Sequence, residues 1–158
     1  MSKVVIIMGS RADLLHTKKV SAVLKEFGVD YVLRIASAHK TPLKVLEIIK
    51  EYEPERVVFI TVAGRSNALS GFVDANTTKP VIATPPNNSE FTRVDIFSSL
   101  RMPSGVCPMV VLEPSEAALA AIKILAIGDE KLARRIKEYQ QKKQEDIEKH
   151  DSEVMQNG

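Results

Sequence analysis

The segment Ser37-Ala38-His39-Lys40-Thr41-Pro42 brings a histidine and a lysine together between hydroxyl residues. An imidazole with an ordinary pKa of ~6.5 exchanges a proton near neutral pH, so His39 is a natural candidate for a proton carrier. Lys40 is a compact positive charge suited to a phosphate group. A helix-capping loop that merely happens to carry a histidine is the alternative, with Thr41 as the cap of a helix that starts at Pro42.

A second candidate segment, Gly9-Ser10-Arg11-Ala12-Asp13, follows a run of apolar residues and leads into a helical pattern. Free N–H groups at a helix start favour an anion, and we expect Gly9 to turn the chain with a positive φ. Ser10 offers a hydroxyl donor, and Asp13 offers an acceptor for sugar hydroxyls. Ordinary capping of the helix by Ser10 or Asp13 is the alternative. The glycine patterns of dinucleotide and triphosphate sites are missing.

The third candidate segment is Ala63-Gly64-Arg65-Ser66-Asn67-Ala68-Leu69-Ser70-Gly71. Backbone N–H groups around Gly64, together with the side chains of Ser66 and Asn67, would make a small cradle for a carbonyl or carboxylate. A glycine cap followed by polar caps is an equal alternative on spacing alone. If the three segments meet, they favour a ribose-phosphate substrate and a proton-linked reaction without a cofactor.

Five short apolar runs alternate with segments of helical periodicity, and the three candidate loops lie between them. The expected strands are 4–8, 31–36, 57–60, 80–83 and 109–112, and the expected helices are 13–27, 41–52, 66–76, 93–101 and 115–128. This alternation predicts an α/β fold, a three-layer αβα sandwich around a five-stranded parallel sheet. We expect the flavodoxin-like, Rossmann-like strand order 2-1-3-4-5, in which ligands bind beyond the carboxyl ends of the strands. All three candidate loops fall at that edge.

Residues 129–150 form a further helical pattern with a thin apolar stripe of Leu132, Ile136, Tyr139 and Ile147 on an otherwise charged segment. One interpretation is a solvated helix partly docked on its own sheet, and the other is a helix that packs against a partner subunit. We expect residues 1–150 to form a single domain with this extended terminal helix, and residues 151–158 to be a disordered tail.

Composition narrows the class of protein. A chain of 158 residues with a net charge of +2 fits one domain and does not favour a nucleic-acid or membrane surface. One cysteine excludes a disulfide framework and a Cys-rich metal cluster. No stretch reaches the ~20 apolar residues of a membrane span, and a cytoplasmic location is expected. His16 and His150 fall inside a helix and near the chain end, and we interpret both as incidental.

Four ordered segments together resemble the phosphoribosylaminoimidazole (AIR) carboxylase family of purine biosynthesis. They are Met8-Gly9-Ser10 with Asp13, residues 37–42, residues 63–71 and Ser98-Ser99-Leu100-Arg101-Met102-Pro103-Ser104-Gly105, within a resemblance that runs from about Lys3 to Ile136. The mutase branch of the family, which moves a carboxyl group from a carbamate nitrogen to carbon, has a second histidine at the end of its third loop. Here no histidine occurs between His39 and His150, so the chain looks like the class II branch, which carboxylates AIR directly with CO2.

The resemblance implies a role for each matching residue. It also implies a reaction that needs no metal, biotin or ATP. Ser10 and Lys40 would hold the 5′-phosphate, Asp13 the ribose, and His39 would remove the proton that carboxylation leaves on the ring. The residues that would shape the CO2 pocket are Ser37, Gly64, Arg65, Ser66 and Asn67. The chain departs from the family at Ala12, where a hydroxyl residue is usual, and Arg11 is the candidate to replace that phosphate contact.

The resemblance also implies a homo-oligomer, an octamer or a tetramer, with contacts through the loop at Pro103-Ser104-Gly105 and through the terminal helix. The mutase reaction remains an alternative on the same scaffold. A flavodoxin-like signalling or ligand-binding module is less favoured. A receiver needs an acidic residue after the third strand, where residues 61–64 supply none, and an FMN site needs flanking aromatics, whereas the chain has no Trp and 5% aromatic residues.

Overall fold

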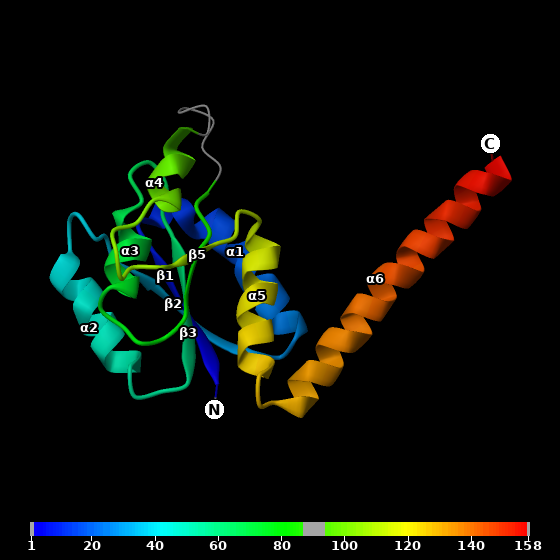
Figure 1. Cartoon of the computed structure of the whole chain (residues 1–158), viewed down its shortest axis with the longest axis horizontal. Coiled ribbons are helices and arrows are strands. Elements are labelled where there is room, and N and C mark those ends of the chain that lie inside the picture. The colour runs from blue at the N-terminus through cyan, green and yellow to red at the C-terminus, as the bar shows by residue number, and fades with distance from the viewer. Residues whose placement is uncertain (1, 87–93, 158) are drawn as a thin grey trace.

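The computed structural model describes residues 2–86 and 94–157 and is built around a five-stranded parallel sheet in the order β2-β1-β3-β4-β5 (Figure 1). The strands are β1 (Lys3–Met8), β2 (Asp30–Ile35), β3 (Val57–Val62), β4 (Val81–Ala83) and β5 (Met109–Val110). The predicted fold class and strand order are confirmed. The last two strands are shorter than the apolar runs suggested.

The two central strands explain why the apolar runs are continuous rather than alternating. β1 pairs with β2 on one side and β3 on the other, so that Val4 lies opposite both Tyr31 and Val58. Every residue of β3 is buried, as is β1 from its second residue. A parallel sheet with both faces covered selects such β-branched runs.

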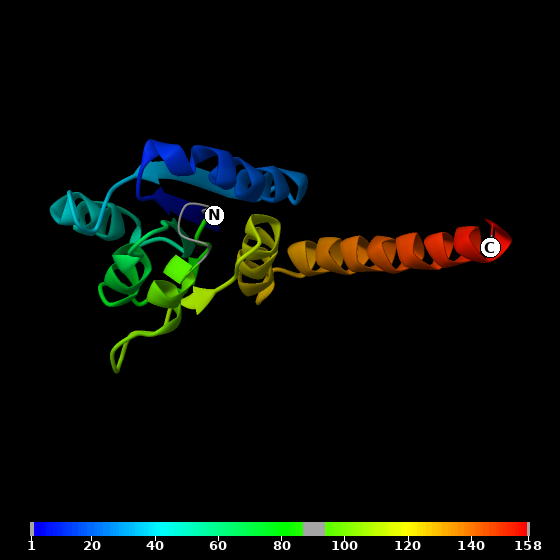
Figure 2. The same ribbon diagram turned by 90° about the horizontal axis from the view of Figure 1, so that it is seen from above.

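Helices cover both faces of the sheet and make three layers (Figure 2). On one face, α1 (Leu14–Glu26) and α5 (Pro114–Ala126) pack with the side chains of Val4, Ile6 and Val58. On the other face, α2 (Pro42–Tyr52) and α3 (Ala68–Asp74) pack with Val5 and Phe59. Parallel strands joined by these crossovers all end at the same edge, and the loops that follow β1, β2 and β3 meet there.

Short helical turns flank that edge. A 3-10 turn, η1 (Arg11–Asp13), precedes α1, and the pair η3 (Val94–Ile96) and α4 (Phe97–Leu100) lies between β4 and β5. The helix expected over 93–101 is therefore present as two short pieces, and its first residue, Arg93, lies outside the described residues.

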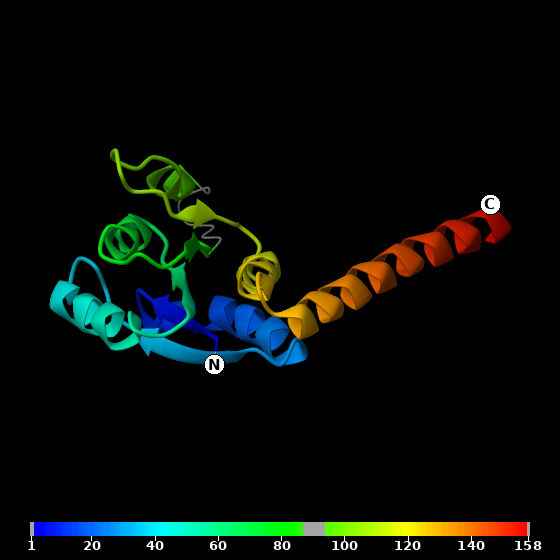
Figure 3. The same cartoon turned by 60° about the horizontal axis from the view of Figure 1, so that its bottom comes forward.

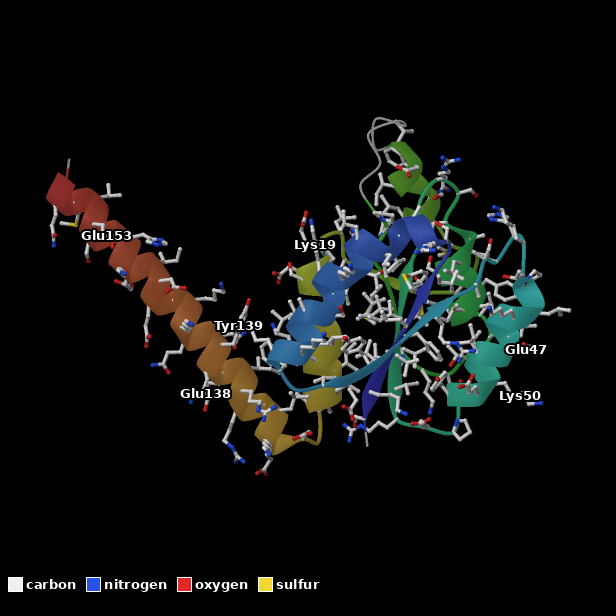
Figure 4. All side chains as sticks on the ribbon, turned by 180° about the vertical axis from the view of Figure 1, so that it is seen from behind. Lys19, Glu47, Lys50, Glu138, Tyr139 and Glu153 are labelled. Carbon is white, nitrogen blue, oxygen red and sulfur yellow. The ribbon has the colours of Figure 1, made fainter. Side chains whose placement is uncertain are left out.

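The terminal helix α6 (Glu130–Asn157) leaves the body of the molecule and projects far beyond it (Figures 1 and 3). Its first turns dock on the domain beside α5 and the end of α1, with Leu132 and Ile136 buried and the Tyr139 ring 5.2 Å from the Phe27 ring. Figure 4 shows Tyr139 beside the end of α1, whereas Glu153 lies near the outer end of the helix. The first turns are docked on their own domain, as one interpretation expected, and packing of the outer part against a partner subunit stays a prediction.

The disordered tail expected over 151–158 is wrong for residues 151–157, because α6 continues to Asn157. No glycine or proline interrupts the chain between Gly128 and Gly158. A Lys149–Glu153 ion pair of 3.8 Å and a hydrogen bond from Ser152 Oγ to the Glu148 carbonyl lie along this last stretch. Pairs of opposite charge four residues apart support a helix that has no other contacts. Over the described residues, no helix is both long enough and apolar enough to cross a membrane.

Candidate functional site

A cavity of about 420 Å³ opens at the carboxyl ends of the strands, where the loops after β1, β2 and β3 converge. It is lined by Gly9, Ser10, Ala12, Asp13, Ser37, Ala38, His39, Lys40, Ala63, Gly64, Arg65, Ser66, Leu69 and Pro86. The structure thus brings together every residue proposed for the site from the sequence except Asn67. Arg11, the candidate to replace the hydroxyl missing at Ala12, does not line the cavity.

The first loop both caps a helical turn and faces the cavity. Asp13 Oδ2 accepts hydrogen bonds from the Ser10 backbone N–H (2.9 Å) and hydroxyl (3.2 Å), and Ser10 Oγ accepts one from the Ala12 N–H (3.2 Å). The other carboxylate oxygen of Asp13 accepts no hydrogen bond from the described residues. Burial raises the pKa of Asp13, although the two bonds from Ser10 counter part of that effect. The capping alternative is therefore realised, in a residue that also lines the cavity.

Gly9 has a different role from the one expected. The glycines with positive φ in the described chain are Gly28, Gly105 and Gly128, so Gly9 does not turn with positive φ. A Cβ at position 9 would instead lie 3.3 Å from the Ala63 Cβ and 3.6 Å from Asp13 Oδ2. Glycine is used here because the first and third loops approach closely at the floor of the cavity.

The second loop is closed by Thr41 and Ser37. The Thr41 hydroxyl accepts from the Ser37 N–H (2.9 Å) and donates to the Ser37 carbonyl (3.3 Å), and Ser37 Oγ accepts from the Lys40 N–H (3.2 Å). Thr41 was expected to cap α2, but its hydroxyl makes no such bond. The same hydroxyl instead fixes a tight loop, on which His39 and Lys40 lie exposed at the cavity mouth.

The third loop turns Gly64, Arg65 and Ser66 to the cavity but not Asn67. The Asn67 side chain is buried, accepts from the Ser70 N–H (3.3 Å) at the start of α3 and donates to Ser99 Oγ (2.8 Å). Its assignment to the pocket lining is therefore corrected: the residue caps a helix and holds α4. The capping alternative weighed for this loop applies to Asn67 alone.

Two residues of the cavity, Pro86 and Leu69, are not among the site residues expected from the sequence. Pro86 lines the cavity from the loop after β4, and Leu69 lines it from α3. Pro86 follows the carboxyl end of a parallel strand, which is where ligands bind in such sheets, and that position is its signal in the sequence. Leu69, as an apolar residue on a helix, could not be told from an ordinary core residue.

His16 is structural rather than incidental. Its Nε2 lies 3.0 Å from Thr84 Oγ1, and the Thr84 hydroxyl donates to the Leu112 carbonyl (3.2 Å). With the hydroxyl proton on the Leu112 carbonyl, the Thr84 oxygen accepts from His16 Nε2. Burial, aided by the charge of Lys19, lowers the pKa of His16, which keeps the ring neutral in this link between α1 and the ends of β4 and β5.

Over residues 2–86 and 94–157, no three His, Cys, Asp or Glu side chains group closely enough to hold a metal ion. The polar groups of the cavity are instead an exposed imidazole, an exposed ammonium, an exposed guanidinium, a partly buried carboxylate and small hydroxyls. This set suits a small phosphorylated sugar derivative and the transfer of one proton.

The sequence model of the AIR carboxylase family matches residues 3–146. The chain belongs to this family. It is 62% identical to the phosphoribosylaminoimidazole carboxylase of Archaeoglobus fulgidus over 96% of this chain and 84% of that protein. It is also 40% identical to the N5-carboxyaminoimidazole ribonucleotide mutase of Methanocaldococcus jannaschii, over 94% of this chain and 95% of that protein.

The fold agrees with a solved member of the AIR carboxylase family. The crystal structure of Treponema denticola PurE superposes with a TM-score of 0.94 at 46% identity, over 97% of this chain and 98% of that chain. The resemblance inferred from four sequence segments is therefore confirmed, and so is the three-layer fold expected from the alternation of strands and helices.

Proposed function

We propose that this enzyme carboxylates 5-aminoimidazole ribonucleotide (AIR) with CO2 to give 4-carboxy-5-aminoimidazole ribonucleotide (CAIR), with His39 as the proton carrier. The observation that carries the proposal is the single cavity in which His39, Lys40, Asp13 and the Gly64 loop all meet. The carboxylase of A. fulgidus, at 62% identity, supports the same reaction.

Substrate binding is proposed to rearrange the first loop. In the free protein, the Ser10 hydroxyl donates to Asp13 Oδ2. When it turns to donate to the 5′-phosphate, beside the positive charge of Lys40, Asp13 Oδ2 is released to accept a ribose hydroxyl. Phosphate and ribose are thus recognised through one exchange of hydrogen bonds, since a hydroxyl has only one proton to donate.

The carbon–carbon bond is proposed to form when the electron-rich ring carbon of AIR attacks the carbon of CO2. The intermediate then carries a proton and a carboxylate on the same ring carbon. His39 takes that proton, and the electron pair of the broken C–H bond returns to the ring. Without proton removal the new bond would break again and release CO2, so a base at the cavity mouth is needed.

CO2 is uncharged and offers little for electrostatic attraction. We therefore assign its position to Gly64, Arg65 and Ser66 of the third loop, assisted by Ser37, all of which line the cavity. Their contribution is to hold CO2 against the ring carbon, which raises the rate by orientation rather than by activation of the molecule.

The mutase reaction is the second candidate, supported by the M. jannaschii mutase at 40% identity. It delivers a carboxyl group to the same ring carbon and requires removal of the same proton. The absence of a second histidine between His39 and His150 favours the reaction with CO2.

The deciding experiment supplies the purified protein with AIR and bicarbonate/CO2, and separately with the carbamate at low CO2, and follows the appearance of CAIR. We expect CAIR from AIR and CO2. The His39→Asn variant should lose at least ~100-fold in kcat while AIR binding, measured by calorimetry, is retained. Faster product formation from the carbamate at low CO2 would replace this proposal by the mutase reaction, and undiminished turnover in His39→Asn would remove the proton-transfer role.

We also propose that the chain acts as a homo-oligomer, an octamer or a tetramer. Large apolar side chains are widely exposed on the described surface, among them Leu15 (75%), Leu43 (73%), Phe97 (65%) and Ile127 (76%). Contacts with other copies of the chain would remove these side chains from water. The cytoplasmic location and the absence of nucleic-acid and membrane partners stay predictions from composition.

A further inference from the structure

Arg65 holds a backbone conformation that its residue type disfavours. Its φ is +62°, and it is the only non-glycine residue with positive φ over the ranges 2–86 and 94–157. A Cβ-bearing residue adopts this left-handed region only when its surroundings hold it there. Because Arg65 lies in the wall of the cavity, whatever holds it also sets the shape of that wall.

The groups that hold Arg65 come from η3 and α4, thirty residues further along the chain. Asp95 Oδ2 accepts a hydrogen bond from the Arg65 N–H (2.8 Å). The Ser98 hydroxyl lies within hydrogen-bond distance of two carbonyls, that of Arg65 (3.2 Å) and that of Asp95 (2.7 Å), and it accepts from the Asn67 N–H (3.0 Å). The Arg65 N–H is therefore bound by this segment, and the Arg65 carbonyl shares the one Ser98 hydroxyl proton with the Asp95 carbonyl.

The Asp95 carboxylate also lies directly behind Gly64. A Cβ built on Gly64 would lie 3.5 Å from Asp95 Oδ2. Asp95 itself does not line the cavity, so any effect it has on a bound substrate must pass through the loop. The contacts are with backbone, which means that the carboxylate fixes the course of the chain rather than the orientation of one side chain.

From these contacts we propose that Asp95 is a positioning residue that holds the Gly64–Arg65 turn in the shape required for placing the carboxyl donor. The inference rests on the proposed function, in which this loop holds CO2 while the first two loops hold the ribose phosphate of AIR. Loss of the Asp95 acceptor frees Arg65 to leave the left-handed region and moves the cavity wall. The donor site is disturbed and the AIR site is not.

The test compares three variants of the full chain by steady-state kinetics at varied CO2 and varied AIR. Asp95→Ala should lower kcat/KM for CO2 by at least about tenfold while KM for AIR stays within about threefold. Asp95→Asn keeps a carbonyl oxygen that accepts from the Arg65 N–H, and should retain most of the activity. Glu53→Ala is the matched control, because Glu53 likewise accepts from a loop N–H, that of Thr78 (3.2 Å), at the other end of the strands. It should leave both parameters unchanged.

A second comparison isolates the backbone effect. Glycine adopts positive φ freely. In an Arg65→Gly chain, the further change Asp95→Ala should therefore lower kcat/KM for CO2 by a clearly smaller factor than it does in the natural chain. An equal cost in both chains would overturn the proposal, as would natural kinetics in Asp95→Ala or an equal loss in Asp95→Asn and Asp95→Ala. A KM for AIR that rises as much as that for CO2 would assign Asp95 to the whole cavity instead, and would also overturn it.

The two levels of the proposal fail in different ways. If the natural protein makes CAIR only from the carbamate, the proposed function fails, and the same variant ratios are then measured with the carbamate as the carboxyl donor. If Asp95→Ala unfolds, as judged by circular dichroism, the Asp95→Asn variant and the Arg65→Gly pair still decide the question.

Discussion

His39 and Asp13 share one cavity but lie in different surroundings. His39 is exposed on a loop closed by Thr41, whereas Asp13 is partly buried beneath it and accepts two hydrogen bonds from Ser10. Burial disfavours the charged carboxylate and raises its pKa, so the ionised Asp13 side chain lowers the stability of the fold. A residue that weakens the fold while facing a cavity is a common sign of function.

This reasoning predicts how Asp13→Asn behaves with pH. The folded chain binds the Asp13 proton more tightly than the unfolded chain, so the ionised carboxylate destabilises the fold at pH values above its raised pKa. The asparagine variant should therefore melt at a higher temperature than the natural protein at pH 7, and the difference should shrink as the pH falls toward about 4. KM for AIR should rise in the same variant. A lower melting temperature at pH 7 would mean that the bonds from Ser10 outweigh the burial of charge.

At the scale of the element, connections between distant segments hold the functional loops and helix ends. Gly28 ends α1 with φ +63°, and the preceding carbonyl, that of Phe27, accepts a hydrogen bond of 2.6 Å from Arg135 Nη1 of α6. A Cβ at Gly28 would lie 2.7 Å from that nitrogen. The end of one helix is thus shaped both by its own glycine and by the helix that docks against it.

Gly28→Ala and Gly105→Ala therefore make an informative pair. Both glycines have positive φ, so each alanine carries a backbone cost of about 1 kcal/mol, but a Cβ at Gly105 (φ +84°) meets nothing within 4 Å. Gly28→Ala should lower Tm by more than Gly105→Ala, because it also displaces the Arg135 side chain. Thermal melts of the two variants provide the comparison, and equal losses would show that the contact with α6 contributes nothing at this position.

At the scale of the whole molecule, the outer part of α6 lacks a partner within its own domain. Ile147, Val154 and Met155 are exposed by 68%, 71% and 78%. Charge is divided along the same helix: residues 130–143 contain six Lys or Arg and two Glu, whereas residues 144–157 contain five Asp or Glu and one Lys. A projecting helix with apolar side chains and an acidic outer half suits a basic surface on another copy of the chain.

Removal of residues 144–158 should therefore reduce the number of subunits in the assembly without unfolding the domain. The core contacts of α6 end at Tyr139, so the shortened chain keeps the part of the helix that packs on α1 and α5. Light scattering after size-exclusion chromatography measures the assembly, and circular dichroism reports the fold. An unchanged oligomer in the shortened chain would contradict a role for the outer helix in subunit contacts.

The sequence alone determined the architecture and the location of the site. The apolar runs and helical periods predicted the strand order, and parallel crossovers place every following loop at one edge, so the segments at Ser10, His39 and Gly64 had to converge. Only the tertiary structure decided what each side chain does there. In it, the Asn67 side chain bonds to Ser99 instead of lining the cavity, and the Thr41 hydroxyl bonds to Ser37. The strained Arg65 donates its N–H to Asp95. The physical reason is that periodicity and turn chemistry are local, whereas the bonds of Arg65 and Asn67 span about thirty residues and leave no pattern in either segment. The Thr41 bond is local, but a helix start and a tight loop compete for the same hydroxyl, and the sequence does not rank them.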